Sequence, residues 1–399
     1  MKNKRVMVLG GDGFFGWPCS LYLSQMGYNV TIVDSLIRRR IDEELGCGSL
    51  TPIRSIWDRI DAWEELSGRR IKFKNLDISR NYAGFVNILA NVNPDVVVHL
   101  AEIRSAPYSM KSDSHKRATV NDNVNATNNT LCALTEVAPS AHLIHIGTAG
   151  VYGYHSAGIK LPEGYVDVII KQGGSDIEMN IPFPTNPGSV YHMTKCMDAE
   201  MFRFYSGLYG LKITDLHQGI IWGTQTDQTA MDERLINRFD YDGDYGTVLN
   251  RFLMQAALGH PLTVHGAGGQ TRALIHLRNS VQCVLLAIKN PPADSVVRVI
   301  NQATEVTSVN SLAEQVSELT GAEIAHCHNP TRVEAEGNKL DLCCDTLIKL
   351  GLEPITLEEG LMEEIYQIAD KYKDNCDSRK IIAHSVWRKG MKTGLVSEI

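Results

Sequence analysis

Short, mostly apolar runs alternate with segments of helical periodicity along the first half of the chain. Such runs are typical of parallel strands that are buried on both faces, and a helical pattern over residues 15–26 follows the first of them. Pro18 falls in the first turn of that expected helix, where proline is tolerated. Strands and helices alternating at this spacing predict right-handed crossovers and a parallel sheet covered by helices on both faces. The expected strands are residues 5–9, 30–33, 71–73, 96–100 and 142–146.

The pattern becomes less regular after about residue 211, where Gly, Pro and Asp clusters separate shorter apolar runs. We therefore expect an α/β fold with a doubly wound parallel sheet and a smaller, discontinuous α/β lobe. The runs around Thr214 and Val299 are expected to return to the main sheet. The predicted division is residues 1–215 with 273–302 for the doubly wound domain and 216–272 with 303–399 for the lobe.

Two segments stand out within this organisation. Residues 36–70 are long for a connection between two strands, which predicts a helical or functional excursion. Residues 357–371 have the pattern of an amphipathic surface helix.

Composition narrows the class of protein. The chain has 399 residues, of which 43% are hydrophobic and 21% charged, as is usual for globular proteins. Its net charge is −7 and no long basic block is present, so duplex nucleic acid is not an expected partner. The nine cysteines include no C-x-x-C pair, which favours a reducing compartment. No apolar run approaches the roughly 18 residues of a membrane span, and the apolar N-terminal run reads as a strand, so we expect a cytoplasmic protein without a membrane partner.

A glycine-rich turn joins the first expected strand to the first helix. Gly10, Gly13 and Gly16 stand where side chains would keep a pyrophosphate away from the helix N-terminus. Asp34 closes the second strand about 20 residues on, where its carboxylate can accept from both ribose hydroxyls of NAD and would repel a 2′-phosphate. The alternative is that the glycines form only a tight turn and that Asp34 is only a solvated acid at the end of a strand. Three arginines follow at residues 38–40 and blur the preference for NAD over NADP; Arg38 is the one expected to flank the adenosine.

Tyr191 and Lys195 share one face of an expected helix that runs to about Leu208. An ammonium in that position can lower the pKa of the tyrosine and orient a cofactor ribose, which provides an acid or base for proton transfer. Thr148 follows the fifth strand, where its hydroxyl can bond a reacting sugar oxygen beside Tyr191. The alternative is an exposed Tyr and Lys on a surface helix.

Taken in order, these motifs resemble the extended short-chain dehydrogenases/reductases, a family of NAD-dependent nucleotide-sugar epimerases and dehydratases. The resemblance implies a Rossmann fold with a nucleotide-sugar lobe. Within that family the chain is most similar, over nearly its whole length, to the UDP-sulfoquinovose synthase branch. The segments that carry this similarity are residues 49–53, 104–110, 237–242, 246–247, 250–251, 259–264, 268–272 and 332–336.

For that branch the resemblance implies a specific reaction. Bound NAD oxidises carbon 4 of UDP-glucose, water is eliminated across carbons 5 and 6, sulfite adds to carbon 6, and hydride returns to carbon 4. Tyr191 would be the base, Lys195 its electrostatic partner, Thr148 the orienting hydroxyl and His192 a proton shuttle at carbons 5 and 6. A histidine on the helix surface is the alternative for His192.

The resemblance also implies two sets of binding residues and a homodimer. The residues expected to bind NAD are Gly10, Asp12, Gly13, Phe14, Phe15, Gly16, Asp34, Ser35, Arg38, Asp77, Ile78, Leu100, Glu102, Arg104, Asn123, Tyr191 and Lys195. Those expected to bind the nucleotide sugar are Arg104, Thr148, Tyr191, Gln218, Asn250, Thr263, Arg272, Arg332 and Glu334. We expect no metal, because His326 and His328 lack further ligands at a suitable spacing.

Four positions distinguish the possible reactions. Ala149 and Gly150 stand where ordinary 4,6-dehydratases have Asp and Glu, which disfavours that reaction. Against the sulfoquinovose branch, Val151 replaces a carboxylate and Ile103 replaces an amide. The alternatives are therefore a nucleotide-hexose 4-epimerase or an atypical 4,6-dehydratase that needs no sulfite. An NAD-sensing protein of the same fold without catalysis is a third hypothesis, against which the intact Thr148, Tyr191 and Lys195 argue.

Overall fold

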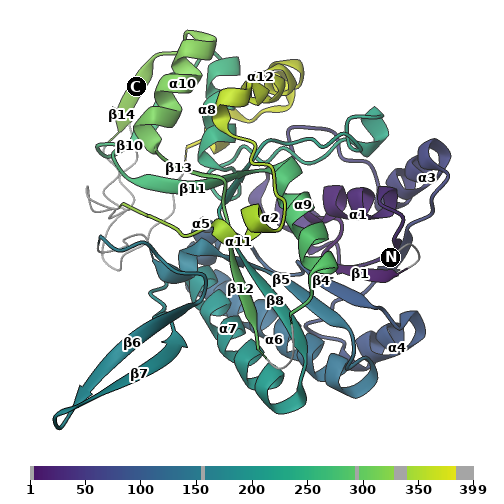
Figure 1. Cartoon of the computed structure of the whole chain (residues 1–399). Coiled ribbons are helices and arrows are strands. Elements are labelled where there is room, and N and C mark those ends of the chain that lie inside the picture. Colours follow the sequence, from purple (N-terminus) through teal and green to yellow (C-terminus); the bar gives the residue numbers. More distant parts are fainter. Residues whose placement is uncertain (1–3, 154–157, 293–295, 328–338, 383–399) are drawn as a thin grey trace.

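A seven-stranded parallel sheet forms the centre of the molecule (Figure 1). The computed structural model describes residues 4–153, 158–292, 296–327 and 339–382. The strand order β3-β2-β1-β4-β5-β8-β12 changes direction between β1 and β4, and ligands of such sheets bind outside the carboxyl ends of the strands at that point. The strands are β1 (Arg5–Leu9), β2 (Asn29–Asp34), β3 (Lys72–Asn75), β4 (Val96–His99), β5 (His142–Thr148), β8 (Lys212–Gln218) and β12 (Arg298–Gln302).

Both faces of the sheet are covered, which explains why its strands read as continuous apolar runs. Val6 and Val8 of β1 pack into one core cluster, whereas Met7 and Leu9 pack into a second cluster on the other face. The first face is covered by α1 (Gly16–Gln25), α9 (Leu277–Lys289) and α11 (Asp345–Lys349), and the second by α4 (Tyr82–Val92), α6 (Asp113–Val137) and α7 (Val190–Tyr209). The predicted doubly wound α/β fold is thus confirmed.

The second lobe lies above the carboxyl ends of the strands in Figure 1. It contains a three-stranded sheet and a two-stranded sheet that pack against helices around a core of Leu249, Phe252 and Leu312. As predicted, β8 and β12 return to the main sheet. Residues 271–276, however, form a strand of the three-stranded sheet in the second lobe, although the predicted doubly wound domain includes residues from 273 onward. The exact domain division stays a prediction. The elements are β9 (Ile220–Trp222), β11 (Thr271–His276) and β13 (Glu305–Ser308) in one sheet, β10 (Leu262–His265) and β14 (Ile324–Cys327) in the other, and α8 (Val248–Ala257), α10 (Val309–Thr320) and α12 (Leu361–Lys371).

The long connection after β2 is helical, as predicted. It contains α2 (Ile37–Leu45) and α3 (Ile56–Ser67), and Ser55 caps α3 by accepting a hydrogen bond from the Asp58 amide. The C-terminal helix predicted over residues 357–371 begins only at Leu361. Gly360, with φ of 75°, separates it from a 3-10 turn over Leu357–Glu359.

A two-stranded arm that the sequence reading did not predict projects from the molecule (Figure 1). It consists of β6 (Tyr165–Gln172) and β7 (Ser175–Pro182), joined by Gly173 and Gly174, whose φ values of 57° and 91° suit a two-residue hairpin turn. Its cross-strand pairs include Val166 with Ile181, Val168 with Met179 and Ile170 with Ile177. Because paired residues share a face, one face of the arm is aliphatic.

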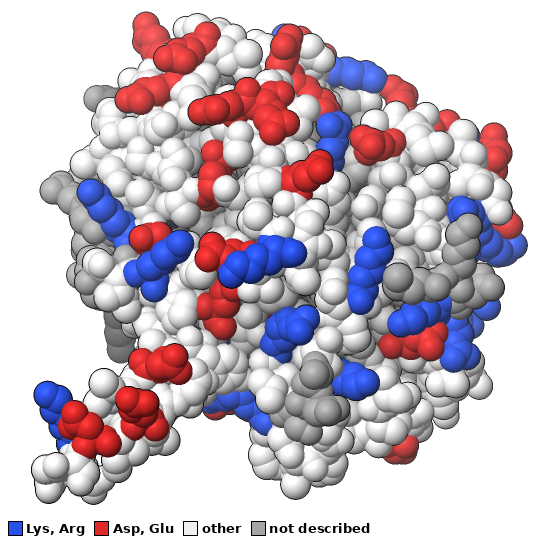
Figure 2. All heavy atoms as spheres, viewed as in Figure 1, with Lys and Arg blue, Asp and Glu red and all other residues white. Residues whose placement is uncertain are grey.

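Charges of both signs are distributed over the face seen in Figure 2, with acidic side chains gathered over the upper lobe. Within the described part of the chain, no helix combines the length and the apolar character that crossing a bilayer requires.

Candidate active site

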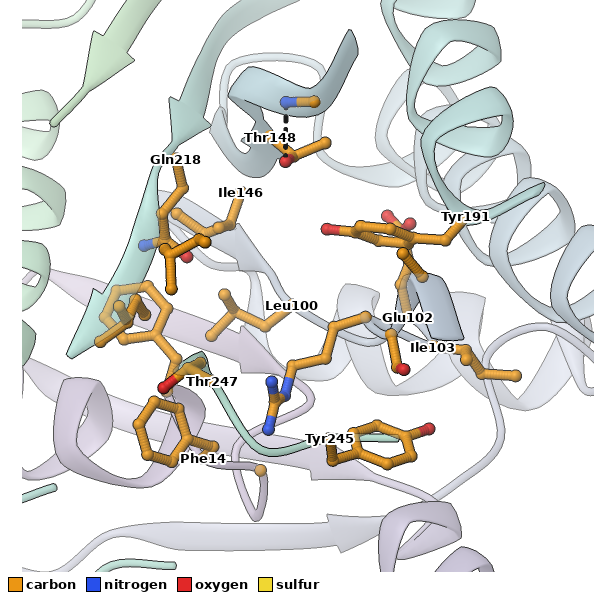
Figure 3. A pocket seen from close by; sticks show the side chains of 18 of the residues that line it. Phe14, Leu100, Glu102, Ile103, Ile146, Thr148, Tyr191, Gln218, Tyr245 and Thr247 are labelled. Carbon is orange, nitrogen blue, oxygen red and sulfur yellow. Dashed lines mark hydrogen bonds between the residues drawn. The ribbon is translucent and has the colours of Figure 1, made fainter. Parts of the chain in front are cut away.

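A cavity of about 430 Å³ opens at the carboxyl ends of the main strands, between the sheet and the second lobe. Nearly all of the residues predicted to bind NAD line it. Figure 3 shows Thr148 and Tyr191 at one end of this cavity and Phe14 and Tyr245 at the other. The predicted residues that line it are Gly10, Asp12, Gly13, Phe14, Phe15, Gly16, Asp34, Ser35, Arg38, Asp77, Ile78, Leu100, Glu102, Arg104, Thr148, Tyr191, His192, Lys195, Gln218, Thr263 and Arg272.

The glycine-rich turn leaves no room for a side chain at Gly10 or Gly16. A Cβ on Gly16 would lie 2.0 Å from the Gly10 carbonyl oxygen, and one on Gly10 would lie 2.7 Å from the Leu100 carbonyl. Gly10 also has a φ of 84°, which favours glycine. The turn therefore presents bare backbone at the N-terminus of α1, as binding of a pyrophosphate requires.

Asp34 closes β2 at the floor of the cavity. Its carboxylate accepts hydrogen bonds from the Asp12 amide at 2.8 Å and the Leu36 amide at 2.7 Å, one on each oxygen. Burial raises its pKa to about 6. A carboxylate oxygen has a second lone pair to offer, so Asp34 can still accept from ribose hydroxyls. The turn and Asp34 together fit a dinucleotide.

Two of the three arginines after β2 make different contacts. Arg38 lines the cavity, where its guanidinium lies 3.8 Å from the Tyr245 ring centre and 3.1 Å from Asp240. Arg39 instead pairs with Asp12 at 2.6 Å. The predicted contact of Arg38 with the adenosine stays a prediction.

Tyr191 stands in the first turn of α7, where its amide donates to the Ser109 hydroxyl at 3.1 Å. Burial raises the pKa of Tyr191, while Lys195, Arg104 and a hydrogen bond to Thr148 lower it. Lys195 thus lowers the pKa of Tyr191, as expected. For the chain alone, however, burial outweighs Lys195 and the other interactions, so the net pKa of Tyr191 is raised and the expectation of a lowered value is wrong.

Lys195 is buried beneath Tyr191 in a cluster of charged groups. Its Nζ lies 2.8 Å from Glu102 Oε2, 2.9 Å from His145 Nε2 and 2.8 Å from the Ile146 carbonyl oxygen. Burial opposes the negative charge of Glu102, but Lys195 and His145 outweigh that effect and hold the pKa of this carboxyl well below its usual range. Glu102 was predicted to bind the cofactor, but its carboxylate is already engaged by Lys195.

His192 is buried rather than exposed on the helix surface. Its ring lies against Gly150, where a Cβ would come within 2.4 Å of His192 Nε2, and its Nδ1 lies 3.1 Å from the Ser189 hydroxyl. Burial lowers the pKa of His192 to about 4, so the imidazole is neutral near pH 7. The glycine at position 150 thus makes room for the histidine.

The residues predicted to bind the sugar nucleotide are only partly brought together. Gln218, Thr263 and Arg272 line the cavity, and Arg104 pairs with Asp240 at 2.5 Å. Asn250 is buried within α8 and does not line the cavity. Arg332 and Glu334 lie outside the described residues.

Asn123 was predicted to bind the cofactor but does not line the cavity. Its amide oxygen accepts from the Ile103 amide at 2.7 Å, and its amide nitrogen donates to the Ile103 carbonyl at 3.1 Å and to Thr194 at 3.1 Å. Asn123 therefore links the segment after β4 to α7 through hydrogen bonds. The position of Asn123 in the sequence did not indicate this contact between distant segments.

The predicted site residues leave out part of the lining. Ile146, Tyr245 and Thr247 reach the cavity, as Figure 3 shows. Ile146 sits just before Gly147-Thr148, so proximity to that motif could have indicated it. Tyr245 and Thr247 arrive from the second lobe, and only tertiary packing places them here.

The two departures from the sulfoquinovose branch lie in different places. Ile103 lines the main cavity and belongs to the core of the second lobe. Val151 lies in η1 (Ala149–Tyr152) and does not line the main cavity; it lines a second cavity of about 380 Å³ beside the base of the arm.

Glu102, His145 and Asp198 also lie close enough together to hold a metal ion. The Lys195 ammonium already provides a cation there, since it contacts both Glu102 and His145. This geometry gives no reason to invoke a metal.

Comparison with known proteins places this site in a family. Residues 6–303 match the family model described as NAD dependent epimerase/dehydratase. The chain belongs to the NAD-dependent epimerase/dehydratase family. As a member it is an NAD-dependent enzyme, in agreement with the turn and with Asp34.

Among curated relatives, the chloroplastic UDP-sulfoquinovose synthase of Spinacia oleracea is 43% identical over 97% of this chain and 80% of its own length. The UDP-sulfoquinovose synthase of Sulfolobus acidocaldarius is 39% identical over 96% of this chain and 98% of its own. Among solved structures, the UDP-glucose 4-epimerase of Thermotoga maritima superposes with a TM-score of 0.66 at 22% identity, covering 92% of this chain and 98% of the other. This last likeness concerns the fold.

Proposed function

We propose that this enzyme forms UDP-sulfoquinovose from UDP-glucose and sulfite. The relatives at 43% and 39% identity over nearly the whole chain bear that name, and the branch-specific segments of the sequence support it. The reaction needs a base for the hydroxyl at carbon 4, a proton carrier at carbons 5 and 6, and room for a nucleophile beside carbon 6.

The Tyr191 phenolate would remove the proton from the hydroxyl at carbon 4, and Thr148 would orient that oxygen. Lys195 stabilises the phenolate because its positive charge lies beneath the ring. Bound NAD supplies an acceptor for the hydride and later returns it. The glycine-rich turn and Asp34 would hold it.

The contact between His192 and Gly150 is the observation that carries the proposal furthest. A neutral imidazole can accept a proton from carbon 5 and deliver one to a leaving hydroxyl. Glutamate at position 150, as in ordinary 4,6-dehydratases, would collide with this ring, because even a Cβ comes within 2.4 Å. The chain therefore has a histidine where those enzymes have a carboxylic acid.

The departures at Val151 and Ile103 bear unequally on the proposal. Val151 lines the second cavity rather than the main one, so the loss of a carboxylate there removes no group from the proposed site. Ile103 does line the main cavity. It favours the second candidate, a nucleotide-hexose 4-epimerase or atypical dehydratase that acts without sulfite.

The deciding experiment is product analysis by mass spectrometry and NMR after incubation with UDP-glucose, with and without sulfite. We expect a sulfite-dependent product with a carbon–sulfur bond at carbon 6. A product that forms equally without sulfite, whether an isomer or a 4-keto sugar, would assign the enzyme to the second candidate. Absence of any reaction would contradict UDP-glucose as the substrate.

We also propose that two copies of the chain form a homodimer through α7. Met193, Met197, Phe204 and Leu208 are separated by four, seven and four positions and are all exposed, with Phe204 at 60% and Leu208 at 61%. Side chains at this spacing share one helix face. A second copy that presents the same face would bury this row.

A further inference from the structure

Lys195 rests on a buried histidine that the proposed reaction does not use. His145, on β5, is completely buried, and its Nε2 lies 2.9 Å from Lys195 Nζ and 3.0 Å from Glu102 Oε1. On the other side of the ring, Nδ1 lies 2.8 Å from Asp215 Oδ1, and Asp215 Oδ2 in turn lies 3.0 Å from His217 Nε2. A carboxylate thus orients an imidazole that touches the proposed catalytic lysine.

The backbone of β5 is shaped around this arrangement. A Cβ on Gly147 would lie 2.5 Å from Asp215 Oδ1 and 3.0 Å from the His217 ring. Any larger residue directly before Thr148 would therefore push Asp215 away from His145. Gly147 makes room for the carboxylate in the same way that Gly150 makes room for His192.

The Glu102 carboxylate bridges Lys195 and His145. Lys195 Nζ donates to Glu102 Oε2 at 2.8 Å, and His145 Nε2 lies 3.0 Å from Oε1 of the same carboxylate. Burial opposes the charge of Lys195, but Glu102 and the other nearby anions outweigh burial and raise the pKa of Lys195. With Asp215 at its Nδ1, His145 can therefore carry a second positive charge beside the ammonium.

We infer that His145 and Asp215 form a positioning dyad that adds a positive charge beside Lys195 and so sets the charge beneath Tyr191. The inference rests on the roles proposed above for Tyr191 and Lys195. In it, Lys195 and His145 together supply the positive charge that favours the phenolate, and Asp215 keeps that charge from being lost to the buried surroundings.

The groups around His145 in the described structure are consistent with this role. Burial and Lys195 oppose its protonation, but Asp215 and Glu102 outweigh them and raise the pKa of His145 to about 9. Burial lowers the pKa of His99, on β4, to about 3, so it is neutral. Burial, with the nearby Glu102 charge, raises the pKa of Asp198, on α7, to about 8, so it is largely protonated near pH 7. Phe202 of α7 packs against the His145 ring, while Thr127 of α6 contacts His99 and His217 of β8 contacts Asp215.

The test follows the pH dependence of NAD reduction after UDP-glucose is added to the NAD-loaded enzyme in the absence of sulfite. His145→Gln removes a positive charge and leaves the negative charge of Asp215 in place. The pKa of Tyr191 should rise, and the acidic limb of the rate should move up by about one pH unit, or about tenfold in rate on that limb. The KM for UDP-glucose should not change, because His145 does not line the cavity.

Two further variants separate charge from packing. His142→Gln is the matched control: His142 is also buried on β5 and bonds Thr214 on β8 at 2.9 Å, but it has no contact with Lys195. It should keep the wild-type pH profile. The double variant His145→Gln, Asp215→Asn removes one charge of each sign and should return the acidic limb toward the wild-type position. A merely structural role predicts the opposite, a larger loss in the double variant at every pH.

An NMR titration of wild-type protein labelled at histidine nitrogen tests the same inference without activity. His145 should stay protonated up to about pH 9, whereas an ordinary histidine loses its proton near pH 6.5. Its signal is assigned by its loss in His145→Gln or, if that variant does not fold, by its change in Asp215→Asn.

The outcomes distinguish this inference from the proposed function. A pH profile of His145→Gln that matches wild type, or a His145 signal that titrates near or below pH 6.5, overturns the dyad even if the enzyme makes the expected product. If Tyr191→Phe still reduces NAD, or wild type does not reduce it with UDP-glucose, the proposed function fails and the titration decides the dyad by itself.

Discussion

Single residues determine which chemistry the cavity can perform, and several do so by being small. Gly150 admits the His192 ring, Gly147 admits the Asp215 carboxylate, and Gly16 brings the backbone of the turn close to Gly10. In each case a missing Cβ lets a functional group or a backbone segment occupy the space. The identity of these glycines therefore matters as much as that of the charged residues they accommodate.

The contact at Gly150 leads to a prediction at this scale. In Gly150→Ala the new Cβ collides with His192, so the imidazole must move from its place against residue 150. We expect product formation to fall by about 100-fold, the contribution typical of a positioned acid or base, while NAD stays bound. Steady-state rates and the NAD content of the purified protein check this.

The matched control is Gly48→Ala, since nothing lies within 4 Å of a Cβ at Gly48. It should keep the wild-type rate. A fully active Gly150→Ala chain would remove His192 from the proposed reaction.

Asp34 provides a second prediction for a single residue. Its buried carboxylate lines the cavity, and in the proposed binding mode it accepts from the ribose hydroxyls of NAD and would repel a 2′-phosphate. Asp34→Ser should weaken binding of NAD at least tenfold and narrow the preference over NADP, as measured by calorimetry with both dinucleotides. Unchanged discrimination between them would contradict the role of Asp34.

At the scale of elements, α7 carries two different sets of side chains on two faces. Its inner face carries Tyr191, His192 and Lys195, and its outer face carries the exposed row from Met193 to Leu208. Burial of the outer row in a dimer would fix the helix that bears the proposed catalytic groups. In the proposed dimer, a single helix would connect the site with the interface between the two copies.

This arrangement predicts the effect of charges on the outer face. Phe204→Glu with Leu208→Glu should convert a dimer to a monomer, because two carboxylates per copy cannot be buried without partners. Light scattering coupled to gel filtration measures the mass. Ile348→Glu is the control, since Ile348 is exposed on α11, away from α7. A wild-type chain that elutes as a monomer would contradict the proposed dimer.

At the scale of the whole molecule, the buried carboxylate of Asp240 connects the second lobe to arginines of the doubly wound domain. Asp240 contacts Arg38 at 3.1 Å, Arg238 at 3.2 Å and Arg104 at 2.5 Å. Burial raises the pKa of Asp240, but the three arginines outweigh it and hold the pKa well below its usual range. Because Arg38 and Arg104 also line the cavity, Asp240 sets the shape of the site between the lobes.

Removal of this charge should lower stability in a pH-dependent way. Asp240→Asn leaves three arginines without their shared partner, and we expect a loss of about 3 to 5 kcal/mol in the free energy of unfolding near pH 7. The contribution of a carboxylate with a depressed pKa is present above its unfolded value of about 4 and is lost as the pH falls below it. The difference from wild type should therefore shrink on acidification.

Denaturant unfolding at several pH values checks this. The control is Asp377→Asn, which removes an exposed pair with Arg379 and should leave the stability unchanged. A difference between Asp240→Asn and wild type that stays constant down to low pH would contradict the electrostatic explanation.

Much of this could be predicted from the sequence because it depends on short-range geometry. The order of strands and helices, the glycine turn, Asp34 at the end of β2, and Tyr191 with Lys195 on one helix face follow from periodicity and local spacing. The hairpin arm was missed although Gly173-Gly174 lies between two apolar runs. It projects from the molecule, so its pattern did not fit that of a buried strand.

What only the tertiary structure decided is which distant side chains meet. His145 and Asp215 are 70 residues apart, Arg104 and Asp240 are 136 apart, and Asn123 meets Thr194 across 71 residues. Periodicity places each of these on a strand, helix or loop but does not say what faces it. The sequence alone therefore determined the elements and the cofactor motif. The packing of α7 against the sheet determined which charges lie beneath Tyr191, and the packing of the second lobe against the sheet determined the walls of the cavity.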